Sequence, residues 1–270
     1  MYKIVRRRNL NDCVTLFEVD APEVAKAFKP GQFAILRVDE AGERFPLTIA
    51  AADPARGTVT IVFQIVGKST RKLNALQEGD QILDFAGPLG KPSDLDGLRE
   101  VCLVVGGVGS AAGYPLAKAL HDEGATVDAV AGFRTRDLII LDEEYREVSK
   151  LYLVTDDGSA GEKGLVTDRL AKLLDEKKYD LVIAVGPLAM MQAVAKLTRA
   201  RDQRTVVSMN PIMIDGTGMC GGCRVTYYGE VKFACVDGPE FDAFGIDFDE
   251  AILRSKMYRR EEREEDCRLL

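Results

Sequence analysis

Between residues 101 and 198, short apolar runs alternate with segments of helical spacing. The apolar runs cover residues 101–105, 127–133, 151–155 and 181–185, and the helical segments cover residues 110–121, 138–148, 167–174 and 188–198. Strands buried on both faces read as continuous apolar runs, and neighbouring parallel strands need a crossover helix between them. The pattern therefore predicts an α/β unit with a parallel sheet, completed by a last strand at residues 204–209.

The segment before this unit has a different period. From residue 2 to about residue 92, apolar and polar residues alternate in short runs that are separated by turn pairs such as Pro30-Gly31, Gly79-Asp80 and Gly87-Pro88. Such alternation is typical of antiparallel strands with one buried face. We therefore expect an antiparallel β barrel here, with one short helix at residues 69–76.

Composition narrows the class of protein. The chain has 270 residues, a formal net charge of -7 with dispersed basic residues, and one histidine, His121. No apolar stretch reaches the roughly 18 residues of a membrane helix, and no apolar run follows the basic amino terminus, so we expect a cytoplasmic protein without membrane contact. Nucleic acid is not expected as a partner. We expect His121 at a helix end on the surface, and Cys13 and Cys102 in the core.

The sharpest motif combines one aspartate with three cysteines. Asp215 is followed after four residues by Cys220, after two more by Cys223, and after eleven more by Cys235, with glycines at positions 216, 218, 221 and 222. A plant-type [2Fe-2S] site has this spacing with cysteine in the first position, because a glycine-rich loop must wrap two irons. We predict a [2Fe-2S] site with Asp215 as the oxygen ligand. The alternative is a structural zinc site.

A second motif lies where the first apolar run of the α/β unit meets its helix. Gly106, Gly107 and Gly109 precede Ala112, and the last three of these residues fit the pattern G-x-G-x-x-G/A. In that pattern the glycines let a pyrophosphate approach the backbone at a helix amino terminus. The position at the first strand and helix of a repeated unit favours a nucleotide site over a simple tight turn.

Charged residues follow the next two predicted strands. Arg134 and Arg136 follow the second strand, where an NAD-selecting fold would ordinarily have an acidic residue, and Asp156 follows the third. The arginines could bind a 2′-phosphate, stack on adenine or form a solvated loop. Ligands of open α/β sheets bind at these carboxyl ends, so we include Arg134 and Asp156 among the nucleotide-binding candidates.

The barrel and the cysteine motif together resemble a known family. Its motifs here are Arg-x-Pro-x-Thr at residues 44–48, Gly-x-x-Thr at 67–70, Gly-Pro-Leu-Gly at 87–90 and Gly-Gly-x-Gly at 106–109. These are similar to the ferredoxin reductase family of flavoproteins. The aspartate-led run 215–225 and the run 234–242 narrow the resemblance to the small subunits of NADH-dependent reduced ferredoxin:NADP oxidoreductases, also described as sulfide dehydrogenases. Electron-transfer subunits of dihydroorotate dehydrogenase have cysteine at the first ligand position. The resemblance covers almost the whole chain.

The resemblance implies cofactors and their residues. It places FAD against Arg44, Pro46, Leu47 and Thr48 and its pyrophosphate against Gly67, Ser69 and Thr70, and it places NAD(H) against Gly106, Gly107 and Gly109. Two departures affect the transfer of roles. Relative to the family's Arg-x-Tyr-Ser pattern, Arg44 sits one residue early and Leu47 replaces the tyrosine. Phe244 stands where the family would have a histidine, so no role is carried over to that position.

The resemblance also implies a function and a partner. The chain would pass electrons between NAD(H), FAD and a [2Fe-2S] cluster, and on to a larger flavin and [4Fe-4S] subunit, in a heterodimer that carries out flavin-based electron bifurcation. The alternatives are a dihydroorotate dehydrogenase electron-transfer subunit and a zinc-stapled nucleotide-sensing regulator. The expected domains are an FAD-binding barrel at 1–97, an NAD(P)-binding unit at 98–208, a [2Fe-2S] unit at 209–248 and a charged helical tail at 249–270.

Overall fold

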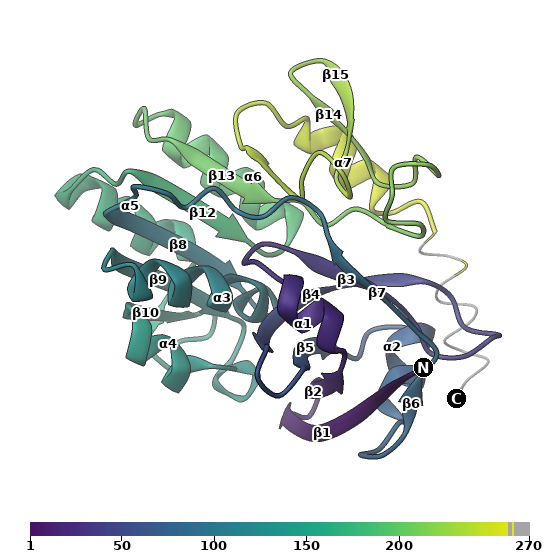
Figure 1. Ribbon diagram of the computed structural model, residues 1–270. Helices are drawn as coiled ribbons and strands as arrows, with labels where there is room; N and C mark the ends of the chain where they lie inside the picture. Colours follow the sequence, from purple (N-terminus) through teal and green to yellow (C-terminus); the bar gives the residue numbers. More distant parts are fainter. Residues whose placement is uncertain (259–260, 262–270) are drawn as a thin grey trace.

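The computed structural model describes residues 1–258 and 261, and within them two large sheets lie side by side (Figure 1). The first sheet is antiparallel and has the strand order β6-β1-β2-β5-β4-β3-β7. Its two edge strands are separated only by Leu83, whose amide donates to the carbonyl of Val38 at 3.1 Å, so the sheet curls into a nearly closed barrel. The strands are β1 (Tyr2–Asn11), β2 (Val14–Asp20), β3 (Phe33–Arg37), β4 (Phe45–Asp53), β5 (Thr58–Gln64), β6 (Gln81–Ile82) and β7 (Asp84–Leu89).

This sheet confirms the antiparallel barrel that the alternation of apolar and polar residues predicts for residues 2–92. Its core is apolar, and Phe17 and Phe63 meet inside it in an edge-to-face contact with ring centroids 5.2 Å apart. Helix α2 (Lys68–Asn74) confirms the expected short helix. A further helix, α1 (Pro22–Ala27), was not expected from periodicity; its proline stands in the first turn, where no amide donor is needed.

The second sheet has the order β11-β10-β9-β8-β12-β13-β16, and all its neighbouring strands are parallel except the edge pair of β13 and β16. Helices α3 and α4 pack on one face, and α5 and α6 on the other. The expected parallel sheet is therefore confirmed. Its elements are β8 (Glu100–Gly106), α3 (Gly109–Asp122), β9 (Thr126–Phe133), α4 (Asp142–Val148), β10 (Lys150–Thr155), β11 (Glu162–Lys163), α5 (Val166–Glu176), β12 (Leu181–Val185), α6 (Leu188–Arg199), β13 (Thr205–Ser208) and β16 (Glu240–Asp242).

Two local predictions need correction. The helix expected at residues 138–148 is interrupted, because Leu141 takes a left-handed conformation with φ of 58° and separates the short turn η1 (Arg136–Leu138) from α4. The composition after residue 215 predicts a hairpin of residues 224–228 and 231–234 that turns at Gly229 and Glu230. The hairpin of β14 (Arg224–Tyr227) and β15 (Glu230–Phe233) instead turns at Tyr228 and Gly229, one residue earlier. Both residues have positive φ, which is the geometry of two-residue hairpin turns that match the strand twist.

The carboxyl-terminal segment is built into the molecule rather than appended to it. Strand β16 pairs antiparallel with β13, and the hairpin packs in the same apolar core as the sheet. Helix α7 (Phe248–Arg254) follows, and half of the expected tail helix at 249–270 lies outside the described residues. Among the residues that the structure describes, no helix combines the length and apolar character needed to span a membrane.

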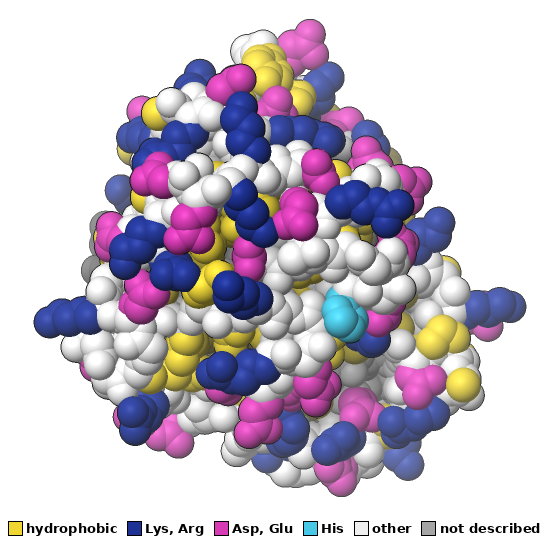
Figure 2. All heavy atoms as spheres, turned by 90° about the vertical axis from the view of Figure 1, so that its left-hand side faces the viewer, with side chains coloured by type: hydrophobic (Ala, Val, Ile, Leu, Met, Phe, Trp, Pro, Cys, Tyr) yellow, Lys and Arg dark blue, Asp and Glu magenta, His cyan; other side chains and the backbone are white. Residues whose placement is uncertain are grey.

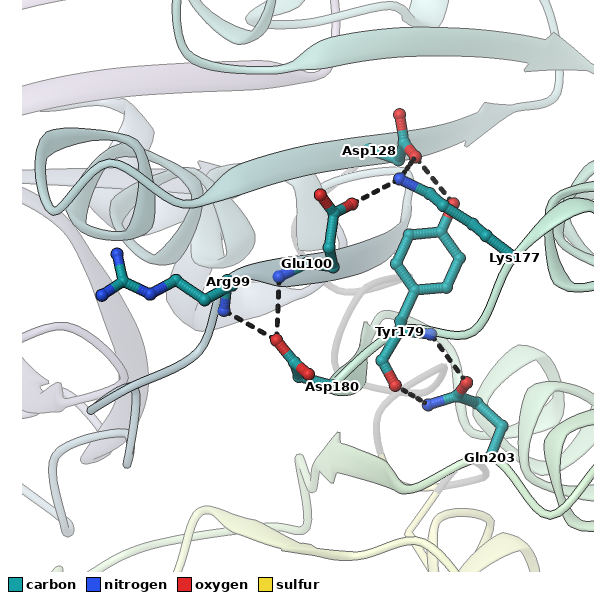
Figure 3. A network of polar contacts seen from close by, with 7 residues as sticks. All are labelled: Arg99, Glu100, Asp128, Lys177, Tyr179, Asp180 and Gln203. Atoms are coloured by element: carbon teal, nitrogen blue, oxygen red, sulfur yellow. Dashed lines mark hydrogen bonds and ion pairs between the residues drawn. The ribbon is translucent and has the colours of Figure 1, made fainter.

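A polar network closes the amino ends of the central parallel strands (Figure 3). The ammonium of Lys177 lies 2.6 Å from Glu100 and 3.1 Å from Asp128, and the hydroxyl of Tyr179 donates to Asp128 at 2.7 Å. The carboxylate of Asp180 accepts from the backbone amides that start β8, at 2.7 and 2.9 Å. The loop before β12 is thereby tied to the first residues of β8 and β9.

The outer face of the α/β unit carries interspersed charges of both signs (Figure 2). His121 is exposed there, in the last turn of α3, as expected. The polar residues at the amino ends and on this face account for structure, and the predicted site residues lie elsewhere.

Candidate functional site

A cavity of about 930 Å³ lies between the barrel and the carboxyl ends of the parallel strands. Its volume falls within the range of ligand and cofactor pockets. It brings together most of the predicted cofactor residues from both units. Those that line it are Pro46, Leu47, Thr48, Thr70, Gly106, Gly107, Gly109, Arg134 and Asp156. Arg44, Gly67 and Ser69 do not line the cavity wall.

On the barrel side, the wall is made by the start of β4 and the start of α2. Thr48 pairs with Phe33 of β3, which also lines the cavity. At the helix, the hydroxyl of Thr70 accepts from the amides of Val66 and Gly67 at 2.9 and 3.1 Å, so these two amides are already satisfied. A Cβ added at Gly67 would meet nothing within 4 Å, which leaves open space beside the first turn of α2.

On the nucleotide side, the glycines at the junction of β8 and α3 differ in the space that surrounds them. A Cβ at Gly109 would lie 2.5 Å from the carbonyl oxygen of Val185, and one at Gly106 would lie 2.6 Å from the sulfur of Met190. These two glycines are required by packing. Gly107 has φ of 55°, and a Cβ there would meet nothing within 4 Å. Gly107 is therefore the position at which a ligand can approach the backbone ahead of the first turn of α3. In that turn the amides of Ser110 and Ala111 donate to the carbonyls of Gly107 and Val108 at 3.1 and 3.0 Å.

The loops after β9 and β10 run side by side. The amide of Asp156 donates to the carbonyl of Phe133 at 3.0 Å, and that of Asp157 donates to the carbonyl of Arg134 at 3.3 Å. The side chain and the amide of Ser159 donate to the Asp157 carboxylate at 2.6 and 2.9 Å, and these bonds lower the pKa of that carboxyl. The cavity wall therefore carries one cation, Arg134, and one anion, Asp156, on neighbouring strand ends.

Several lining residues had no signal in the sequence. Cys13, expected in the core, is half-buried and lines the cavity, whereas Cys102 is fully buried as expected, and burial raises the pKa of its thiol. The segment that leads from β13 toward the cysteine loop forms another part of the wall. The lining residues that periodicity and motifs did not indicate include Val66, Leu165, Ser208, Met209, Asn210, Pro211, Met213 and Pro239.

The cysteine loop gathers two of its expected ligands in direct contact. The sulfurs of Cys223 and Cys235 lie 3.2 Å apart and both residues are buried, whereas Cys220 is exposed. The carboxylate of Asp215 accepts from the amides of Thr217 and Met219, at 2.9 and 3.3 Å, and from the Thr217 hydroxyl. Within the described part of the chain, no group of three or more His, Cys, Asp or Glu side chains is arranged for a metal ion. The full ligand set therefore stays a prediction.

The backbone around the cysteines presents amide donors to their sulfurs. The amides of Gly222 and Asp215 point at the sulfur of Cys220 and lower the pKa of its thiol. The amide of Gly218 points at Cys235, although burial and the hydrogen bond from Cys223 raise the pKa of that thiol to about 12. Amide hydrogen bonds to sulfur are one of the means by which proteins tune iron-sulfur clusters. Three thiols and a carboxylate, from the glycine-rich loop and from the residues that follow the β14–β15 hairpin, are a donor set suited to iron.

The loop also lies against the barrel. A Cβ at Gly216 would be 2.7 Å from Leu89 and 3.0 Å from Ile35, so the backbone there packs directly on β7 and β3. Arg44, just before β4, donates from Nε to the carbonyl of Ile214 at 2.9 Å. The cysteine loop and the barrel are therefore in contact.

Comparisons with known proteins agree with this architecture. Residues 210–247 match the iron-sulfur cluster binding domain of dihydroorotate dehydrogenase B. A protein of Thermotoga maritima described as a dihydroorotate dehydrogenase B (NAD(+)) electron transfer subunit homolog is 48% identical, with 97% of this chain and 93% of that protein covered. An uncharacterized protein in the adh 3′ region of Clostridium beijerinckii is 50% identical, with 97% and 92% covered.

This chain belongs to the family of dihydroorotate dehydrogenase B electron transfer subunits and their homologues. A solved structure described under flavin-based electron bifurcation by the NADH-dependent reduced ferredoxin-NADP oxidoreductase is 46% identical, with a TM-score of 0.95 and 100% of this chain and 98% of that chain covered. The expected fold, a ferredoxin reductase type barrel with an α/β unit and an iron-sulfur binding segment, is confirmed. The chain is an electron-transfer subunit of an oxidoreductase family.

Proposed function

We propose that this chain is the small subunit of a flavin-based electron-bifurcating NADH-dependent reduced ferredoxin:NADP oxidoreductase. FAD and NAD(H) share the cavity, and Asp215, Cys220, Cys223 and Cys235 hold a [2Fe-2S] cluster. The observation that carries the proposal is the aspartate at position 215, in a loop that packs on strands β3 and β7 of the barrel. An aspartate at that position distinguishes this oxidoreductase from the dihydroorotate-linked subunits in the resemblance drawn from the sequence.

The cavity suits hydride and electron transfer rather than acid-base chemistry. A bound flavin exchanges hydride with a nicotinamide and single electrons with an iron-sulfur cluster, so it links two-electron and one-electron carriers. Among the described residues that line the cavity, the ionisable side chains are Cys13, Arg134 and Asp156. The remaining wall is mostly apolar, and it excludes water from the reacting rings. The chain thus needs to orient cofactors, not to supply a general acid or base.

We assign NAD(H) to this subunit and NADP(H) to its partner. Gly107 and the first turn of α3 receive the pyrophosphate, and Arg134 adds a positive charge nearby. Asp156 faces the same cavity, where its carboxylate can accept from ribose hydroxyls and repels a 2′-phosphate. Pro46, Leu47 and Thr48 form the barrel wall on which the flavin lies, with Gly67, Ser69 and Thr70 at its pyrophosphate.

The partner is a larger subunit with flavin and [4Fe-4S] clusters, and the complex is cytoplasmic. The surface around the cysteine loop supports docking there, because large apolar side chains are exposed: Met219 at 87%, Ile214 at 51% and Ile212 at 41%. Exposed apolar side chains grouped on one face mark interaction sites. A partner on this face would receive electrons from the loop without crossing the barrel.

The proposal is tested on anaerobically purified protein. We expect about two irons per chain, the content of one [2Fe-2S] cluster, and faster reduction of the flavin by NADH than by NADPH in stopped-flow absorbance. Much faster reduction by NADPH would overturn the nucleotide assignment. A colourless protein without iron would overturn the proposal itself and leave the zinc-stapled nucleotide sensor.

A second candidate is the electron-transfer subunit of a dihydroorotate dehydrogenase, favoured by the match of residues 210–247 to that family's iron-sulfur domain. Copurification of the tagged chain with its larger subunit separates the two. The proposal predicts ferredoxin reduction coupled to NADP(H) and NAD(H), whereas the alternative predicts NAD⁺ reduction by dihydroorotate. A variant Asp215→Cys with an unchanged cluster potential would remove the distinction on which the proposal depends.

A further inference from the structure

Arg44 was predicted to meet the flavin, and in the structure its guanidinium contacts the cysteine loop and strand β7. Its Nε donates to the carbonyl of Ile214 at 2.9 Å, across 170 positions of sequence. One residue further along, the carboxylate of Asp215 interacts with the positive charge of Arg44. Arg44 does not line the cavity, although the four residues that follow it do. The side chain is therefore directed at the cysteine loop.

The barrel holds Arg44 from the other side. Its NH1 lies 3.8 Å from the carboxylate of Asp84 on β7, and Arg37 on β3 lies 2.7 Å from the same carboxylate. The Arg44 side chain is 34% exposed, so its charge is only partly screened by solvent. A guanidinium presents its donors in a fixed plane, which allows one side chain to bond the loop carbonyl while it faces a carboxylate of the barrel.

We propose that Arg44 is a positioning residue for the iron-sulfur loop, which it ties to the barrel while placing a positive charge beside Asp215. This inference rests on the proposed function, because it requires a cluster in that loop. The one-residue shift of Arg44 relative to the family pattern agrees with a target other than the flavin. A nearby cation stabilises the reduced cluster, which carries one more negative charge than the oxidised cluster.

The test compares Arg44→Gln, Arg44→Lys and the control Arg37→Gln in the full-length, cluster-loaded chain. Arg37 shares Asp84 with Arg44 but, among the described residues, makes no hydrogen bond or ion pair with the loop, so Arg37→Gln reports the effect of disturbing Asp84 alone. The readouts are the redox titration and electron paramagnetic resonance spectrum of the cluster, the flavin content, and hydrogen exchange of the amides in residues 212–220.

For Arg44→Gln we expect the ratio of reduced to oxidised cluster at a fixed potential to fall about fivefold, because one nearby charge is lost. Loop amides should exchange about fivefold faster, as for the loss of one hydrogen bond. Arg44→Lys keeps the charge and should restore the cluster ratio to within about twofold while the loop still exchanges faster. Arg37→Gln should behave as the wild type in both readouts.

Two results would overturn the inference. One is a cluster ratio and loop exchange in Arg44→Gln equal to those of Arg37→Gln. The other is loss of flavin from Arg44→Gln with an unchanged cluster, which would return Arg44 to the flavin site. Failure of the proposed function can be distinguished from failure of this inference. A wild-type chain without iron would disprove the proposed function, whatever the Arg44 and Arg37 variants show.

Discussion

The two ends of the parallel sheet are built in opposite ways. At the amino ends, charged and polar side chains fill the space between strands and satisfy one another, as Lys177 does with Glu100 and Asp128. At the carboxyl ends, glycines and apolar residues leave a cavity of about 930 Å³. The same strands therefore provide a closed end that holds the fold and an open end that receives ligands. A residue at one end should affect stability, and a residue at the other should affect binding.

The largest expected effect is at the closed end. Replacing Asp128 by Ala removes a carboxylate whose side chain is 5% exposed, which leaves the Tyr179 hydroxyl unpaired and Lys177 with Glu100 alone. We expect a loss of about 3 kcal/mol in the free energy of unfolding. Nucleotide affinity should not change. Chemical denaturation and NADH titration measure the two quantities. Asp122→Ala, which removes an exposed pair with Lys118, is the control and should cost no more than about 0.5 kcal/mol. Equal losses in both variants would contradict the comparison.

The next effect is at the open end. Gly107→Ala places a methyl group in open space beside a backbone with φ of 55°. We expect NADH affinity to fall about tenfold, because the pyrophosphate can no longer approach the backbone, while the free energy of unfolding falls by only about 1 kcal/mol from the left-handed strain. Equilibrium binding and denaturation check both values. Gly97→Ala, another glycine with positive φ and open space, controls for strain. Unchanged NADH affinity in Gly107→Ala would exclude Gly107 from the nucleotide site.

The smallest expected effect is the pH dependence of stability that the polar network at the amino ends of the strands produces. Burial and the hydrogen bond to Asp128 raise the pKa of Tyr179. For Lys177 burial acts to lower the pKa, but the hydrogen bonds to Glu100 and Asp128 raise it overall. Both groups have a higher pKa in the folded chain than in the unfolded one. Their contribution is therefore fully present below the unfolded values and is lost as pH rises through the folded values, above about pH 10.

We expect the free energy of unfolding to fall by about 1 kcal/mol per pH unit above pH 10, and to fall less steeply in Tyr179→Phe. Denaturation curves at a series of alkaline pH values measure the slope. The matched control is Tyr2→Phe in the barrel strand β1. If Tyr179→Phe and wild type decline with the same slope, Tyr179 does not couple the network to pH.

Much of the fold could be predicted because the burial of strand and helix faces spaces the apolar residues at regular intervals in the sequence. The five apolar residues of β12 and the alternation in β5 each follow from which faces are covered. Strand β16 was not expected, because three residues carry no period and the strand exists only by pairing with β13. The break at Leu141 was also missed, since nothing in a leucine indicates a left-handed backbone.

The residues of the candidate site also divide into those that the sequence could predict and those that it could not. Gly107, Arg134 and Asp156 could be placed because the carboxyl ends of parallel strands meet at one edge of a sheet. Asn210 and Met213 could not, because they reach the cavity through long-range packing that leaves no motif. Arg44 was placed by resemblance, and its contact with Ile214 depends on a fold that brings residues 170 positions apart together.

The position of β16 has a consequence for biogenesis. This strand follows all four residues of the proposed cluster site, and it completes the edge of a sheet that begins at Glu100. The ribosome must therefore deliver the last quarter of the polypeptide before the middle of the molecule is finished. Until β16 has been synthesised, β13 is an unpaired edge strand, and such a strand is a template for pairing with other chains.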